Sequence, residues 1–195
     1  HVDQVANVLR HDHVEIELYS SPPVPVISGA AVSHDELVLE ASDGNRFAAF
    51  VATPDAGSDT GVVILPDVRG LYRFYQELAL RFAERGYTAL ALDYFGRTAG
   101  AEKRSDEFEY RPHVEAVTPE HVQLDVRAAV EHLRAAQGAR KVFTVGFCMG
   151  GRQSWLAELR WPVRLQEGDE QAVGILALDA VDQLRLAVGP QRGPA

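Results

Sequence analysis

The sequence has a single cysteine among its 195 residues. An internal disulfide is therefore excluded, and the absence of a CxxC pair or a Cys/His cluster leaves no structural zinc site. No apolar run approaches the roughly 20 residues of a membrane-spanning helix, and the opening HVDQVANVLRHDH lacks the apolar stretch of a signal peptide. These absences favour a soluble protein in a reducing compartment, and we expect it in the cytoplasm.

Basic residues are also in short supply. Lysine and arginine number 19 against 28 aspartate and glutamate residues, which gives a formal net charge of -9. Such a balance repels polyphosphate, so nucleic acid is not an expected partner, and no segment suggests membrane attachment. The apolar fraction of 46% is ordinary for a globular domain of this length.

The first residues carry turn signals in place of a helical pattern. Prolines in SSPPVPVISG exclude a helix, so we expect an irregular arm over residues 1–30 and a single domain over 31–195. Two strand-like runs, 36–41 and 46–53, flank the turn sequence SDGN. This arrangement predicts a β-hairpin at the start of the domain.

From Gly61 onward, apolar bursts alternate with stretches of helical periodicity. The bursts GVVILP, YTALALD and KVFTVGF are nearly continuous apolar runs, as in strands that are covered on both faces. Between them, residues 71–86 and 118–137 each have one apolar stripe and one charged face. The pattern predicts an α/β fold with a mostly parallel, doubly wound sheet.

A specific motif follows the third of these strands. The sequence GFCMGG at 146–151 is G-x-C-x-G, and a helical stretch, RQSWLAELR, comes next. A strained strand-turn-helix elbow needs small residues on both sides of the nucleophile, and it places Cys148 at a helix start, where the thiolate is favoured. The backbone N–H of Met149 is then a natural oxyanion donor. The alternative is an inert cysteine of the core.

The run ILPDVRGLYRFYQELALRFAERGYTALALDYFGRTAG, together with VGFCMGG, resembles the dienelactone hydrolases, also called carboxymethylenebutenolidases. The resemblance covers about 37–159 and implies an α/β-hydrolase fold. It also implies that the chain cleaves a lactone or small carboxylic ester through Cys148. The implied substrate is a small, unsaturated molecule that bears a carboxylate, and the resemblance implies no cofactor and no metal.

Three further site residues are implied by this resemblance. Asp67 matches the family's acidic residue that contacts the nucleophile, which is usually the longer Glu, and the N–H of Val68 would be the second oxyanion donor. Arg97 matches the arginine that holds the substrate carboxylate, a role that suits the planar guanidinium. A solvated surface arginine is the alternative. We interpret Asp93, at the end of a buried strand, as a turn cap.

The chain departs from the family after about residue 160. An α/β-hydrolase supplies its triad in the order nucleophile, acid, histidine, yet all seven histidines precede Cys148, so the triad acid and histidine are unknown. AVGILALD could form one more strand, with Asp179 or Asp182 near the position of a triad acid, although helix capping is the default for both. We expect a truncated or frameshifted chain, without the C-terminal strands of the fold.

Two other functions stay open at this point. One is a catalytically impaired remnant or small-molecule-binding protein that lacks the triad histidine. The other is a thiol redox sensor at Cys148, for which the sequence offers no resolving cysteine. An unpaired sheet edge would allow either a monomer or a weak homodimer.

Overall fold

A β-hairpin opens the part of the chain that the structure describes. The structure is a computed structural model that describes residues 32–105, 107–160 and 173–176. Strands β1 (Val32–Glu40) and β2 (Arg46–Pro54) pair antiparallel, with Glu40 opposite Arg46. The Ala41 N–H donates to the Asn45 carbonyl at 2.8 Å and closes the turn. The predicted hairpin is confirmed.

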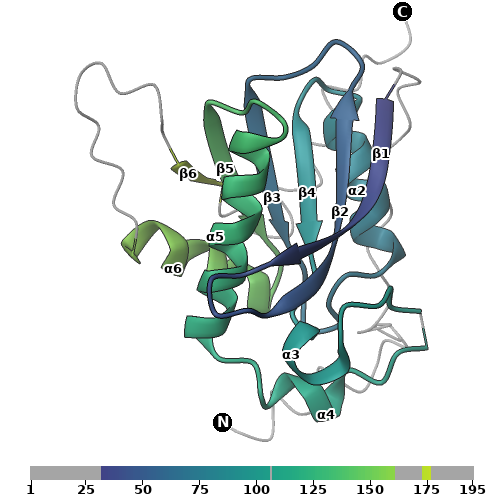
Figure 1. Cartoon of the computed structure of the whole chain (residues 1–195), viewed down its shortest axis with the longest axis vertical. Coiled ribbons are helices and arrows are strands. Elements are labelled where there is room, and N and C mark those ends of the chain that lie inside the picture. The colour runs from purple at the N-terminus through teal and green to yellow at the C-terminus, as the bar shows by residue number, and fades with distance from the viewer. Residues whose placement is uncertain (1–31, 106, 161–172, 177–195) are drawn as a thin grey trace, which may run out of the picture.

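The other described strands add a parallel region to this hairpin. They are β3 (Thr60–Leu65), β4 (Thr88–Leu92), β5 (Lys141–Gly146) and β6 (Val173–Leu176). The sheet order is β1-β2-β4-β3-β5-β6, and β4, β3, β5 and β6 run parallel to one another (Figure 1). Strand β2 pairs antiparallel with β4. The prediction of a mostly parallel sheet opened by a hairpin is confirmed, as is a strand within AVGILALD.

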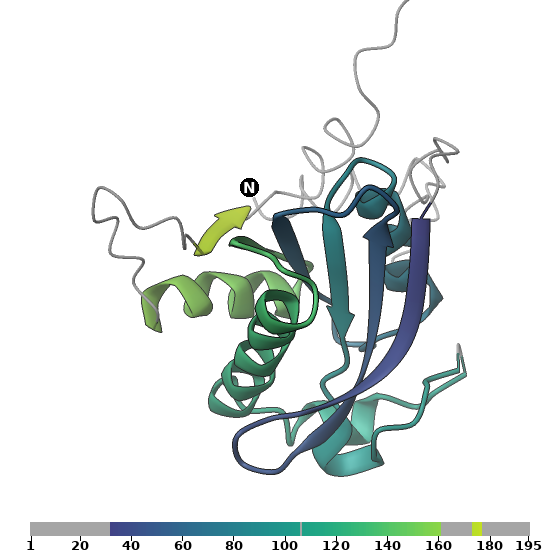
Figure 2. The same cartoon turned by 45° about the horizontal axis from the view of Figure 1, so that its top comes forward.

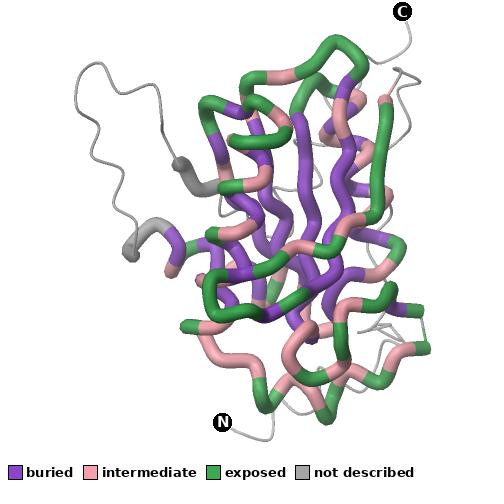
Figure 3. The backbone as a smooth tube through the Cα atoms, viewed as in Figure 1, coloured by how far each residue is buried: buried purple, intermediate pink, exposed green. Residues whose placement is uncertain are grey.

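Helices cover both faces of the sheet. Helix α2 (Arg73–Ala83) packs on one face, and α5 (Pro119–Ala135) and α6 (Met149–Arg160) pack on the other (Figure 2). Because successive strand residues point to opposite faces, Val62 and Ile64 of β3 join the core under α2, while Val63 and Leu65 join the core under α5. Strands β2, β3, β4 and β5 are accordingly buried along most of their length, whereas the edge strand β1 is exposed or half-buried (Figure 3).

Helix α5 begins where its sequence predicts. The Thr118 side chain accepts a hydrogen bond from the His121 N–H at 3.3 Å, with Pro119 in the first turn. This capping satisfies one of the N–H groups that a helix start leaves without an intrahelical partner. The sequence prediction of a helix over 118–137 is therefore confirmed to within two residues at the C-terminal end.

The connection between β4 and α5 contains two short helices that the sequence analysis did not predict, α3 (Gly96–Ala99) and α4 (Arg111–Val114). Asp93 organises its start. Its fully buried carboxylate accepts hydrogen bonds from the N–H groups of Leu71 and Phe95 and from the Arg104 guanidinium. The interpretation of Asp93 as a turn cap is confirmed, because the bond from the Phe95 N–H closes a local turn.

Several sequence predictions fall on residues beyond this description. The irregular arm at 1–30, together with Asp179 and Asp182, lies outside the described residues. Within the described residues, none of the helices combines the length and apolar character that crossing a bilayer requires.

Candidate active site at the strand-helix elbow

The predicted site residues follow three neighbouring parallel strands. Asp67 and Val68 come after β3, Arg97 comes after β4, and Cys148 comes after β5. Because the carboxyl ends of parallel strands meet at one edge of a sheet, the fold brings these residues to the same edge. In Figure 1 the arrowheads of β3 and β4 mark that edge, and α3 lies beside it.

The backbone of Cys148 has an uncommon conformation. Its φ is 51°, the one positive φ at a non-glycine among the described residues, and its side chain is exposed. The left-handed region is sterically costly for a residue with a Cβ, so such strain persists only where the surrounding structure enforces it. Here β5 ends at Gly146 and α6 begins at Met149, which leaves the chain two residues in which to reverse.

The two flanking glycines make that reversal feasible. A Cβ on Gly146 would lie 2.5 Å from the Gly151 nitrogen and would overlap the Gly150 carbonyl oxygen. A Cβ on Gly150 would lie 2.6 Å from the carbonyl carbon of Leu65. The first glycine lets the elbow close on itself, and the second lets it pack against the end of β3. The G-x-C-x-G pattern therefore reflects contact between backbones.

Asp67 lies in a turn that its own side chain organises. Its carboxylate accepts from the Arg69 N–H at 2.9 Å and from the Arg69 guanidinium, with the shortest distance at 2.6 Å. The Arg69 guanidinium also lies over the Tyr72 ring, 4.4 Å from its centroid. The hydrogen bond to Asp67 raises the pKa of Arg69. Among the described contacts, no hydrogen bond joins Asp67 to Cys148.

The backbone N–H groups of this turn differ in one respect. Those of Asp67, Arg69 and Gly70 donate to the Tyr75 hydroxyl, the Asp67 carboxylate and the Asp67 carbonyl, respectively. The N–H of Val68 has no acceptor within the described part of the chain, and neither has that of Met149 at the start of α6. The two groups predicted to form an oxyanion hole are therefore both available, and the N–H of Cys148 likewise has no acceptor among the described residues.

Arg97 is held by two carboxylates. Its guanidinium donates to Asp43 at 2.8 Å and to Asp125 at 2.7 Å, and Asn45 donates to the other Asp125 oxygen at 2.9 Å. The Asp125 side chain is completely buried, and this burial raises its pKa despite the opposing effect of Arg97 and Asn45. The hydrogen bond from Arg97 lowers the pKa of Asp43, the more exposed partner.

This network links the hairpin turn, α3 and α5, and the sequence analysis missed it. Asp125 lies on the buried face of α5 with Val122 and Val126. A lone aspartate on an apolar stripe is a detectable signal, because a buried carboxylate requires a partner. The sequence does not indicate that Arg97 is that partner.

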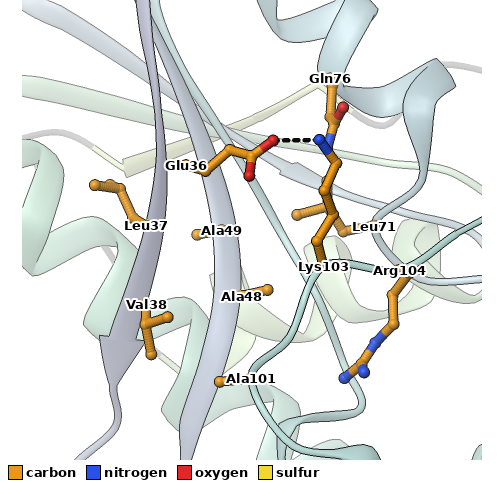
Figure 4. A pocket seen from close by; sticks show the side chains of 10 residues that line it. All are labelled: Glu36, Leu37, Val38, Ala48, Ala49, Leu71, Gln76, Ala101, Lys103 and Arg104. Atoms are coloured by element: carbon orange, nitrogen blue, oxygen red, sulfur yellow. Dashed lines mark hydrogen bonds and ion pairs between the residues drawn. The ribbon is translucent and has the colours of Figure 1, made fainter.

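Two hollows lie near the hairpin. One, of about 620 Å³, is lined in part by Arg97, Asp43 and His121. The other, of about 120 Å³, lies between β1, β2 and the segment after α3, where Glu36 faces Lys103 in an ion pair (Figure 4). Cys148 lines neither of these hollows. Among the described residues, no cluster of three or more His, Cys, Asp or Glu side chains is placed to bind a metal.

Comparisons with known proteins relate the chain to the dienelactone hydrolases. The model of the dienelactone hydrolase family matches residues 47–163. The chain is 27% identical over 149 residues to a carboxymethylenebutenolidase of Rhodococcus opacus, which covers 73% of this chain and 53% of that protein. It is 26% identical over 154 residues to the carboxymethylenebutenolidase of Pseudomonas putida, with 75% and 62% coverage.

A solved structure of a candidate dienelactone hydrolase from Klebsiella pneumoniae is 25% identical and superposes with a TM-score of 0.57, over 68% of this chain and 56% of that one. A dienelactone hydrolase-like promiscuous phosphotriesterase from metagenomic libraries shares the fold at a TM-score of 0.56 and 20% identity, over 75% and 67%. The chain spans about half the length of the curated relatives it matches.

Proposed function

The chain belongs to the dienelactone hydrolase family, and from that premise we propose that it cleaves lactones or small carboxylic esters with the Cys148 thiolate as nucleophile. One observation carries the proposal. An exposed cysteine occupies a left-handed backbone position between two glycines whose Cβ atoms would meet other backbone. Nothing in the packing of an ordinary core cysteine calls for this strain, whereas a nucleophile elbow requires it.

The proposed chemistry starts with acyl transfer to sulfur. The Cys148 thiolate attacks the acyl carbon, and the carbonyl electron pair moves to oxygen to give a tetrahedral oxyanion. The N–H groups of Val68 and Met149 would stabilise that charge. Collapse breaks the bond between carbon and the ester oxygen, so the alkoxide leaves and takes a proton from water, while a thioester stays on Cys148.

Water then hydrolyses the thioester, which releases the carboxylic acid and restores the thiol. In the family's triad order, a histidine oriented by an acid activates that water. We assign neither residue, because every histidine of this chain precedes Cys148. Acylation is therefore the half of the reaction that the proposed residues account for.

Arg97 is the proposed anchor for a substrate carboxylate. It lines the larger hollow, and its guanidinium stays charged at any working pH. To bind a substrate it would exchange its contact with Asp43, the exposed partner, and keep the buried contact with Asp125. The proposed substrate class is accordingly a small lactone or ester that carries a carboxylate.

Asp67 is the acidic residue that we propose to contact the Cys148 nucleophile. Its turn lies next to the elbow, since a Cβ on Gly150 would overlap the Pro66 carbonyl oxygen. The role that we propose for its carboxylate, once released from Arg69, is contact with the Cys148 thiol. A free thiol nucleophile also needs a reducing compartment, such as the cytoplasm. The proposed steps use no cofactor.

The test is intact-mass measurement after mixing the chain with p-nitrophenyl acetate. We expect each chain to gain one acetyl group on Cys148 and to release one p-nitrophenolate as that thioester forms. The Cys148→Ala variant should gain no acetyl group and release no burst. Acetylation at another residue, or none on a folded chain, would contradict the proposal.

A further inference from the structure

One peptide group beside the elbow forms a hydrogen bond with a buried tyrosine at its N–H and another at its carbonyl. The peptide bond between Pro66 and Asp67 has its N–H on Asp67 and its carbonyl on Pro66. The Asp67 N–H donates to the Tyr75 hydroxyl at 2.8 Å, and the Tyr94 hydroxyl donates to the Pro66 carbonyl at 2.7 Å. The two side chains are only 1% and 3% exposed.

The two tyrosines reach this peptide from opposite faces of the sheet. Tyr75 belongs to α2 and to the core beneath it, whereas Tyr94 follows β4 and belongs to the core beneath α5. Because a peptide group is planar, a hydrogen bond at each end restrains the orientation of the whole plane. The next N–H along the chain is that of Val68, whose direction depends on this plane.

Tyr75 also touches the elbow itself. Its ring packs against that of Phe147, the residue before Cys148, with centroids 5.4 Å apart and planes at 65°. The Phe147 N–H in turn donates to the Leu65 carbonyl at 3.0 Å. A single buried side chain therefore contacts the turn after β3 and the turn after β5, the two segments that carry the available N–H groups.

We propose that Tyr75 and Tyr94 are positioning residues, which fix the Pro66–Asp67 peptide so that the Val68 N–H is aimed at the acyl oxygen of an ester bound at Cys148. This inference rests on the proposed function, because it assigns a role in the acyl transfer described above. Among the described hydrogen bonds, both hydroxyls bond to this peptide and neither bonds to Cys148. Their effect is to hold an oxyanion donor in place before the charge develops. Such donors stabilise the transition state strongly because they need no reorientation during the reaction.

The protonation of the two phenols suits this role. Burial raises the pKa of Tyr75 well above its usual value, and the nearby Asp67 carboxylate adds to the effect. Burial likewise raises the pKa of Tyr94. Both hydroxyls therefore keep their protons across the working pH range, so Tyr94 remains a donor to the Pro66 carbonyl.

Two reactions of the same thiol separate this role from a merely structural one. Acylation by p-nitrophenyl acetate passes through an oxyanion, whereas alkylation by iodoacetamide displaces iodide at a saturated carbon and forms none. Both require an accessible thiolate. We therefore compare the two rate constants at one pH for the wild type, Tyr75→Phe and Tyr94→Phe, which keep the rings and remove only the hydroxyls.

We expect each variant to lose acylation by about tenfold or more, since loss of one oxyanion donor costs roughly 10²-fold to 10³-fold. Alkylation should be unchanged. Tyr87→Phe is the matched control, because this exposed tyrosine stands before β4, at the opposite end of the parallel strands. It should leave both reactions unaltered.

Because both hydroxyls act on one peptide, the double variant should lose less than the product of the two single losses. Unchanged acylation, or an equal loss of both reactions, would overturn the inference while the proposed function stands. A folded wild-type chain that is alkylated but never acylated would overturn both.

Discussion

Gly150 and Leu65 approach each other so closely that a Cβ on Gly150 would lie 2.6 Å from the Leu65 carbonyl carbon and would overlap its oxygen. This contact joins the first turn of α6 to the end of β3, and with it the elbow to the turn that carries Asp67 and Val68. The relative placement of the two proposed oxyanion donors therefore depends on the lack of a side chain at one position.

We predict that Gly150→Ala destabilises the fold by about 3 kcal/mol or more, since backbone atoms cannot move aside as a flexible side chain can. Denaturant unfolding measures the effect. Gly151→Ala is the matched control, because its Cβ would meet its nearest neighbour, the Gly146 oxygen, at 3.3 Å. Alanine also favours a helix, so this change should stay within about 1 kcal/mol. An equal loss in the free energy of unfolding for both variants would contradict a specific role for the contact between Gly150 and the Leu65 backbone.

The buried ion pair between Arg97 and Asp125 gives a second stability prediction. Asp125→Ala should cost about 3–5 kcal/mol, because it leaves the Arg97 guanidinium and the Asn45 amide without their buried acceptor. The double variant with Arg97→Ala should cost less than the two single changes together. Asp59→Ala, which breaks the exposed pair with Arg140, should change the unfolding midpoint little. If the losses in free energy of unfolding at Arg97 and Asp125 were additive, the two side chains would not stabilise the fold as an ion pair.

Arg97 also allows the proposed substrate class to be tested. Arg97→Gln should raise the concentration needed for half-maximal acylation of Cys148 about tenfold for an ester that carries a carboxylate, the value of a lost charged hydrogen bond. The same variant should acylate normally with p-nitrophenyl acetate, which carries no carboxylate and serves as the control for folding. Asp43→Asn should have the opposite effect on the charged ester, because Asp43 competes for the guanidinium. An equal change for the two esters would exclude Arg97 as the anchor.

The sheet and its helices could be predicted because their signals are local. The turn SDGN, the apolar strands and the helical stretch 118–137 each depend on neighbours in sequence, and each lies where it was predicted, the helix to within two residues. The elbow could be predicted for the same reason, since its strain is encoded in two glycines four residues apart.

The tertiary parts of the site could not be predicted in this way. The partners of Arg97 are 54 and 28 residues away in sequence, and no local pattern pairs them. The same holds for Tyr94, whose hydroxyl bonds to a carbonyl 28 residues earlier. In sequence, Tyr75 and Tyr94 read as ordinary apolar positions of a helix and a strand end. Their shared role is visible only in the folded structure, where both hydroxyls form hydrogen bonds with the Pro66–Asp67 peptide.

His132 on α5 supplies a prediction about pH. Burial lowers the pKa of its imidazole below the usual 6.5, and its Nε2 has no hydrogen-bond partner among the described residues. As the pH falls through about 6.5, His132 becomes protonated in the unfolded chain while it stays neutral in the folded chain. The free energy of unfolding therefore decreases until the pH reaches the pKa of His132 in the folded chain. His132→Gln, which is neutral throughout, should lose less stability between about pH 7.5 and about pH 5.5 than the wild type does. Urea unfolding of both chains at the two pH values measures the difference, in which the titration of all other groups cancels. An identical loss in the two proteins would mean that His132 is protonated as readily in the folded chain as in the unfolded one, and that its burial on α5 has no electrostatic cost.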